Sequence, residues 1–150
     1  MPAIASAAAG FLLAVLWFDL MFDRQAAGNR NSELPEETLA SISAYYHRIL
    51  TGASPMGSLV ALVMVISVGA HIAELVGDEV PKATAVASLA LLLPAIAIAG
   101  LRTVPAARRL GARTDDATAG STLARSIFRD HLICLVLIAA VLAIQLSAAF

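Results

Sequence analysis

Four apolar segments, each long enough to cross a lipid bilayer, constrain this chain more than any other feature. They run approximately over residues 3–22, 56–76, 83–101 and 132–150, with polar or Gly- and Pro-containing links between them. A helix of about 20 mostly apolar residues spans a hydrocarbon layer about 30 Å thick. The helices of a soluble bundle would each carry a charged face, which these segments lack. The sequence therefore predicts a single all-α domain over residues 1–150, a bundle of four transmembrane helices.

The composition supports a membrane location and excludes two classes of function. The chain is 59% hydrophobic with a mean hydropathy of +0.83, more than a soluble core requires, so the excess is expected to face the lipid bilayer. A formal net charge of −1 shows no basic excess, and we expect no nucleic acid as a partner. Cys134 is the only cysteine, which excludes an intrachain disulfide and a cysteine-ligated metal cluster.

The first long link contains a second kind of helix. In the stretch NSELPEETLASISAYYHRIL, Pro35 suits a first helical turn, and Glu36 with Glu37 favours the positive end of the helix dipole. Apolar residues then recur at helical spacing at Leu39, Ile42, Tyr46 and Ile49. This pattern predicts a short amphipathic helix on the membrane surface.

The basic residues predict the orientation, because positively charged flanks stay in the cytoplasm. Only Lys82 lies near the short link GDEVP, which makes the second and third helices antiparallel neighbours. The others lie in or beside the long links: Arg24, Arg30, Arg48, Arg102, Arg108, Arg109, Arg113, Arg125 and Arg129. We therefore expect a multi-pass membrane protein with both termini non-cytoplasmic. The long link over residues 101–130 is expected to be partly irregular, with breaks at Pro105 and Gly111.

Ionisable residues at the cytoplasmic level form the first candidate site. Asp19 and Asp23 are four residues apart, on one helical face, and His131 could approach them from the last helix. Asp19 lies between apolar neighbours and requires a partner, whereas Asp23 is expected to reach water. If the cluster is catalytic, Asp19 and His131 act as proton acceptor and donor, and Arg102 stabilises developing negative charge. Asp23 and Asp130 are candidate metal ligands, and ordinary interfacial ion pairs are the alternative.

His71 and Glu74 form a second candidate site at the opposite level of the bilayer. Their three-residue spacing lets both face the bundle, and Gln145 lies at a matching depth. Metal sites in helix bundles use Glu and His at this interval but need further ligands from other helices. A buried His–Glu hydrogen bond is the favoured interpretation, and a metal site is the alternative.

Aromatic residues gather at the predicted cytoplasmic boundary. Trp17 and Phe18 lie near the cytoplasmic end of the first helix, and Tyr45 and Tyr46 lie in the surface helix. An aromatic belt is the favoured interpretation. The alternative is a lid over an apolar substrate, in which Trp17 and Tyr46 contact the substrate.

The layout of the chain resembles the anthrone-oxygenase-like family of small four-helix membrane proteins. The resemblance rests on AAAGFLLAVL in the first helix, PMGSLVALV, RTVPAARRLG after the third helix and RSIFRDHLICL opening the fourth. Of the family's polar residues, Arg102 and His131 are present in kind, while Ala107, Ile127 and Cys134 replace others. The resemblance implies an oxygenase-like or redox enzyme.

Two functional hypotheses follow. The first is a small membrane enzyme that takes an apolar or aromatic small molecule from lipid into the helix bundle. The second is a non-catalytic membrane subunit or assembly factor, which binds partner helices through small-residue faces and anionic lipid through basic links. The sequence leaves open the cofactor, the reaction and whether the chain forms a homo-oligomer.

Overall fold

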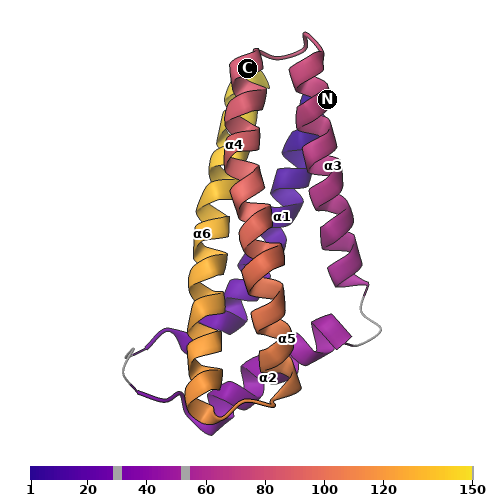
Figure 1. Cartoon of the computed structure of the whole chain (residues 1–150). Coiled ribbons are helices and arrows are strands. Elements are labelled where there is room, and N and C mark those ends of the chain that lie inside the picture. The colour runs from indigo at the N-terminus through magenta and orange to yellow at the C-terminus, as the bar shows by residue number, and fades with distance from the viewer. Residues whose placement is uncertain (29–31, 52–54, 150) are drawn as a thin grey trace.

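Four long helices run side by side through the molecule (Figure 1). This computed structural model describes residues 1–28, 32–51 and 55–149, and these residues contain helices and no strand. The elements are α1 (Pro2–Asp23), the 3₁₀ turn η1 (Arg24–Ala26), α2 (Glu36–Thr51), α3 (Met56–Val76), α4 (Lys82–Ile98), the π-turn η2 (Ala99–Thr103), α5 (Val104–Ala112) and α6 (Ala117–Ala149). The all-helical prediction is confirmed.

The four candidate membrane spans of the described residues are long and apolar enough to cross a bilayer. They cover Pro2–Ala26, Met56–Val76, Lys82–Ala112 and Ala117–Ala148. In cross-section the helices form a ring in the order α1, α6, α4, α3, with each helix packed on its two neighbours. Both termini and the short link after α3 lie at one end of the bundle, and α2 lies at the other (Figure 1).

The surface of the bundle is apolar and its centre is a thin layer of packed side chains. Large hydrophobic residues such as Val65, Leu101 and Val136 are well exposed on the outside. Leu12, Leu92, Ile138 and Val141 are buried in the middle of the bundle. An apolar exterior around a small core is the arrangement expected of a bundle in lipid, because lipid tails are as apolar as the core.

Helix α2 forms where the sequence predicts a helix, and its apolar face packs on the protein itself. Leu39, Ile42 and Tyr46 are buried in one cluster with Leu110 of α5 and Ile127 of α6. The position of α2 along a membrane surface stays a prediction. Its packing places the tyrosines of α2 against the lower end of the bundle.

Gly111 permits the close approach of α5 to α2. A Cβ atom built on Gly111 would lie 2.9 Å from the backbone nitrogen of His47, a distance that real Cβ atoms essentially never show. The sequence predicts a helix break at Gly111, but this glycine lies inside α5, where its lack of a side chain permits the contact with α2.

The prediction of a partly irregular link over residues 101–130 is wrong in extent. Helix α4 continues through η2 into α5, and α6 begins at Ala117, so only residues 113–116 are non-helical. Pro105 sits in the first turn of α5 and does not end the helix, because the π-turn before it accommodates the proline. Arg113, with a φ of 51°, ends the helix in the left-handed conformation.

The π-turn between α4 and α5 has a cause in the sequence. Pro105 has no N–H to donate, and its ring would crowd the carbonyl four residues earlier, at Leu101. The N–H of Val104 instead bonds to the carbonyl of Ala99, five residues back. Such turns often accompany functional sites, and Ala99 and Thr103 both line the cavity described next.

Candidate functional site

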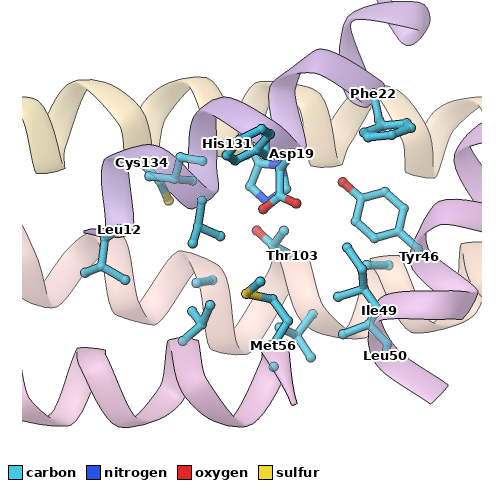
Figure 2. Close-up of a pocket in the computed structure, with 18 of the residues that line it drawn as sticks. Leu12, Asp19, Phe22, Tyr46, Ile49, Leu50, Met56, Thr103, His131 and Cys134 are labelled. Atoms are coloured by element: carbon cyan, nitrogen blue, oxygen red, sulfur yellow. The ribbon is translucent and has the colours of Figure 1, made fainter. Parts of the chain in front are cut away.

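An apolar cavity of about 430 Å³ lies where α2 crosses the lower end of the bundle (Figure 2). Every helix of the described chain contributes to its wall. The contributing residues are Leu12, Val15, Leu16, Phe18, Asp19 and Phe22 of α1; Tyr45, Tyr46, Ile49 and Leu50 of α2; Met56, Gly57, Val60 and Met64 of α3; Ala95, Ala99, Thr103, Val104 and Ala107 of α4 to α5; and His131, Cys134 and Ile138 of α6. This size is in the range of small-molecule sites in proteins.

His131, in the wall of the cavity, forms a short polar contact with Asp23, which lies behind the wall. The Nδ1 atom of His131 lies 2.5 Å from Oδ2 of Asp23, and the Tyr46 hydroxyl donates to Oδ1 of Asp23 over 2.6 Å. Asp23 is 1% exposed and does not line the cavity. A carboxylate in this position accepts both hydrogen bonds, so Nδ1 of His131 carries the proton. The expectation that Asp23 reaches water is wrong, because α2 and α6 cover it.

Asp19 lies on the cavity side of the same cluster. Its Oδ1 accepts a hydrogen bond of 2.6 Å from the Tyr45 hydroxyl, and its Oδ2 lies 3.9 Å from Nε2 of His131. The latter distance is longer than a hydrogen bond. The predicted proximity of Asp19 and His131 is therefore present in the structure. With Nδ1 protonated, Nε2 of His131 keeps its lone pair at the cavity wall, beside a carboxylate.

The two tyrosines act as fixed hydrogen-bond donors. Burial, followed by the neighbouring Asp19 and Asp23 carboxylates, raises the pKa of both Tyr45 and Tyr46 far above the usual tyrosine range. The hydroxyls therefore stay protonated at neutral pH. The ring of Phe22 stacks on Tyr45 with centroids 3.9 Å apart, which further fixes α2 against α1.

Arg102 does not join this cluster. Its guanidinium lies 3.1 Å from Asp130, which Arg129 also approaches to 3.5 Å, and neither Arg102 nor Asp130 lines the cavity. Asp130 and His131 are adjacent on α6, so their side chains point about 100° apart around the helix. The predicted role of Arg102 in stabilising charge at the site therefore has no support in the structure.

The aromatic residues divide between the cavity and the outer surface. Trp17 is 63% exposed and does not line the cavity, whereas Tyr46 does. Phe18, Phe22 and Met56 line the cavity and are also exposed, which places its mouth between α1 and the start of α3. Sequence reasoning placed Asp23 in the cluster but expected it to reach water, and it assigned Tyr45 to an aromatic belt without a partner in the site. The i, i+4 spacing of the aspartates was the available signal, since one tyrosine meets each.

The residues of the second candidate site are buried at the other end of the bundle. His71 Nδ1 lies 2.6 Å from the carbonyl of Ser67, while the Gln145 amide donates to Glu74 over 3.0 Å and to Ser88 over 3.1 Å. The predicted His71–Glu74 hydrogen bond is not formed. The two atoms that could make it, His71 Nε2 and Glu74 Oε1, have no hydrogen-bond partner among the described residues.

In the part of the chain that the structure describes, no group of three or more His, Cys, Asp or Glu residues could hold a metal ion. Asp23 and Asp130 belong to different groups, one bonded to His131 and the other to Arg102, so they do not form a common site. The chain matches no protein-family model, no curated protein and no solved structure. The resemblance found in the sequence therefore stays an expectation.

Proposed function

We propose that this chain is an integral membrane enzyme that removes a proton from an apolar small molecule bound in the cavity. The observation that carries the proposal is the asymmetric surrounding of His131. Its Nδ1 is bonded to a buried carboxylate, Asp23, while the ring lines an otherwise apolar cavity. An imidazole held in this way by a carboxylate is oriented and made more basic at its free nitrogen.

The proposed chemistry follows from the positions of five polar residues. Nε2 of His131 accepts the substrate proton, and Asp23 stabilises the imidazolium that forms. Asp19, 3.9 Å from Nε2, adds a second negative charge that favours this imidazolium. Tyr45 and Tyr46 hold the two carboxylates in place through their hydroxyls. The apolar walls strengthen each of these interactions because they exclude water.

The substrate class follows from the lining. Aside from Asp19, His131 and a few hydroxyl groups, the wall presents aliphatic and aromatic side chains. The mouth between Phe18 and Met56 opens on an exposed apolar surface of the bundle, so the molecule enters from the lipid phase. An aromatic ring system with a weakly acidic C–H or O–H group fits these walls and this base.

The resemblance to the anthrone-oxygenase-like family supplies a specific form of the reaction. The base would remove a proton from the methylene carbon of an anthrone, and molecular oxygen would oxidise the resulting anion. Two C–H bonds are replaced by one C=O bond, one oxygen atom enters the product and the other leaves as water. The oxidant is O₂, and His131 takes the first proton.

The proposal is tested with anthrone and purified protein in detergent. Proton removal is measured without O₂, as exchange of the methylene protons with deuterium in D₂O by NMR, and oxidation is measured as O₂ uptake. We expect His131→Gln to lower the exchange rate by about 10²–10⁴-fold, the usual contribution of a general base. The control is His47→Gln, since His47 lies on the exposed side of α2 and does not line the cavity.

Three outcomes separate the hypotheses. Exchange without O₂ uptake would support the base and remove the oxygenase form. Full activity in His131→Gln would remove the role of His131. Binding of anthrone and related aromatics with no exchange above buffer would favour the non-catalytic subunit.

We also infer that α1, α3, α4 with its continuation, and α6 span the membrane, with both termini on the non-cytoplasmic side and α2 along the cytoplasmic surface. The described arginines lie at the end of the bundle that contains α2, and Lys82 lies at the end that contains the termini. Arg30, another of the basic residues, lies outside the described residues.

A further inference from the structure

The second polar cluster lies within α3, α4 and α6, far from the cavity along the bundle. Ser67, His71 and Glu74 follow one face of α3, at intervals of four and three residues, and His71 is bonded to the Ser67 carbonyl. Gln145 of α6 donates to both Glu74 and Ser88 of α4, and so joins this face to the two other helices. All five are at most 1% exposed. Four polar atoms in this cluster have no hydrogen-bond partner: Ser67 Oγ, His71 Nε2, Glu74 Oε1 and Gln145 Oε1. Unpaired buried polar atoms are rare, and each requires an explanation.

The free nitrogen of His71 is an electron-pair donor. Nδ1 lies 2.6 Å from the carbonyl oxygen of Ser67, which can only accept, so Nδ1 carries the ring proton. Nε2 of the neutral ring then carries a lone pair and faces no donor. Histidines that bind metals usually have this arrangement, with the second nitrogen donating to a carbonyl or a carboxylate.

The two oxygen atoms are also electron-pair donors. The Gln145 amide nitrogen faces two oxygens, those of Glu74 and Ser88, which assigns the free atom of this side chain as its carbonyl oxygen. Glu74 uses Oε2 for the Gln145 bond and leaves Oε1 free. Among the residues that the structure describes, no cationic side chain is bonded to Glu74, so an ionised carboxylate here would be a buried charge without a counter-charge.

We propose that His71 Nε2, Glu74 Oε1 and Gln145 Oε1 bind one divalent transition-metal ion, such as Zn²⁺ or Fe²⁺. The ion would supply the positive charge that Glu74 lacks and would occupy three lone pairs that no other described residue engages. An imidazole among the ligands favours this class of metal over Mg²⁺ or Ca²⁺, which prefer oxygen ligands alone. Ser67 Oγ is available to bond a water molecule that completes the coordination.

The cluster lies close to one end of the bundle. Glu74 is two residues before the end of α3, and the link that follows carries Asp78, whose side chain is fully exposed, and Glu79. Asp78 forms an ion pair with Lys82, and Glu79 forms one with the N-terminal ammonium, so neither supplies a counter-charge to the cluster.

The experiment uses the full-length protein purified in detergent, stripped with a chelator and titrated with Co²⁺ and Zn²⁺. We expect one Co²⁺ to bind per chain, with the visible absorption typical of cobalt held by nitrogen and oxygen ligands. We also expect the melting temperature to rise on addition of Zn²⁺. Glu74→Gln keeps the size of the side chain and a partner for Gln145, and we expect it to weaken binding by at least about tenfold. His71→Asn should do the same.

The matched control is His131→Asn, which removes the histidine of the other polar cluster. Binding retained in this variant and lost in Glu74→Gln would place the ion at the proposed site. Absence of stoichiometric Co²⁺ binding to the wild-type chain would overturn the proposal, as would equal affinity in Glu74→Gln. A melting temperature that responds to pH but to no metal would assign the cluster to a proton or water instead.

Discussion

The two ring nitrogens of His131 have different surroundings, and this difference defines the candidate site. Nδ1 is bonded to Asp23, which is buried beneath α2 and α6, while Nε2 remains at the cavity wall near Asp19. A side chain that bonded equally to both carboxylates would have no free position for a substrate. Asp23, at 2.5 Å, is therefore the carboxylate that orients the ring, and Asp19, at 3.9 Å, is the one that affects the charge on the ring.

The alkaline titration of the tyrosines tests this hydrogen-bond network directly, because the chain contains two tyrosines and both belong to it. Burial and the adjacent carboxylates raise the pKa of Tyr45 and Tyr46 above their unfolded value of 10.0. The folded state then favours neutral tyrosine, so this contribution to stability is complete below pH 10 and is lost as pH rises above it.

We expect phenolate absorption to appear only together with unfolding, at a pH well above 10. Absorption at 295 nm and circular dichroism at 222 nm should therefore change over the same pH range. Phenolate absorption near pH 10 in a chain that is still folded would show that the tyrosines are accessible and not bonded to Asp19 and Asp23.

Much of this site could be expected from the sequence, and the parts that could not depend on packing. Asp19 and His131 share a depth, and helical rise alone brings them to one level. Asp23 is buried, contrary to expectation, because α2 and α6 cover it. A prediction from depth alone does not take these contacts into account. Arg102 lies at the predicted depth, but it forms an ion pair with Asp130, which projects from a different face of α6 than His131.

At the scale of elements, the contact of α2 with α5 controls the lower wall of the cavity. Tyr46 and Ile49 of α2 line the cavity, and the backbone of α2 at His47 rests on Gly111 of α5. The apolar spacing of α2 was sufficient to predict a helix, but spacing could not tell whether its apolar face meets lipid or protein. Gly111, where the sequence predicts a helix break, is the residue that allows α2 to pack on the protein.

Gly111→Ala should separate the two helices. The added Cβ would lie 2.9 Å from the His47 nitrogen, a backbone atom that cannot rotate away, so we expect a loss of about 1–3 kcal/mol of stability. Thermal unfolding in detergent measures this change. The matched control is Gly120→Ala in α6, where the nearest atom is a side-chain carbon of Leu39 at 3.7 Å.

Gly120→Ala should be neutral or stabilising by up to about 1 kcal/mol, because alanine favours a helix more than glycine does. If both variants melt at the wild-type temperature, α2 does not rest on α5 as the structure has it.

At the scale of the whole molecule, the described arginines lie at the end of the bundle that contains α2, and Lys82 lies at the opposite end. Residue 114 is exposed in the turn between α5 and α6, and Asp78 is exposed at the opposite end. In a Cys134→Ser background, Thr114→Cys should resist a membrane-impermeant thiol reagent in intact cells, whereas Asp78→Cys should react. The reverse pattern would invert the proposed orientation but leave the fold intact.

The buried layer of Leu12, Leu92, Ile138 and Val141 separates the two polar clusters and acts as an electrical insulator. A charge crossing this layer would leave every hydrogen-bonding group behind, at a cost of several kcal/mol. A proton accepted by His131 must then return to the aqueous compartment with which the α2 end of the bundle exchanges protons. In vesicles with independently set pH values, turnover should follow the pH on the α2 side alone, and the chain should not dissipate a proton gradient.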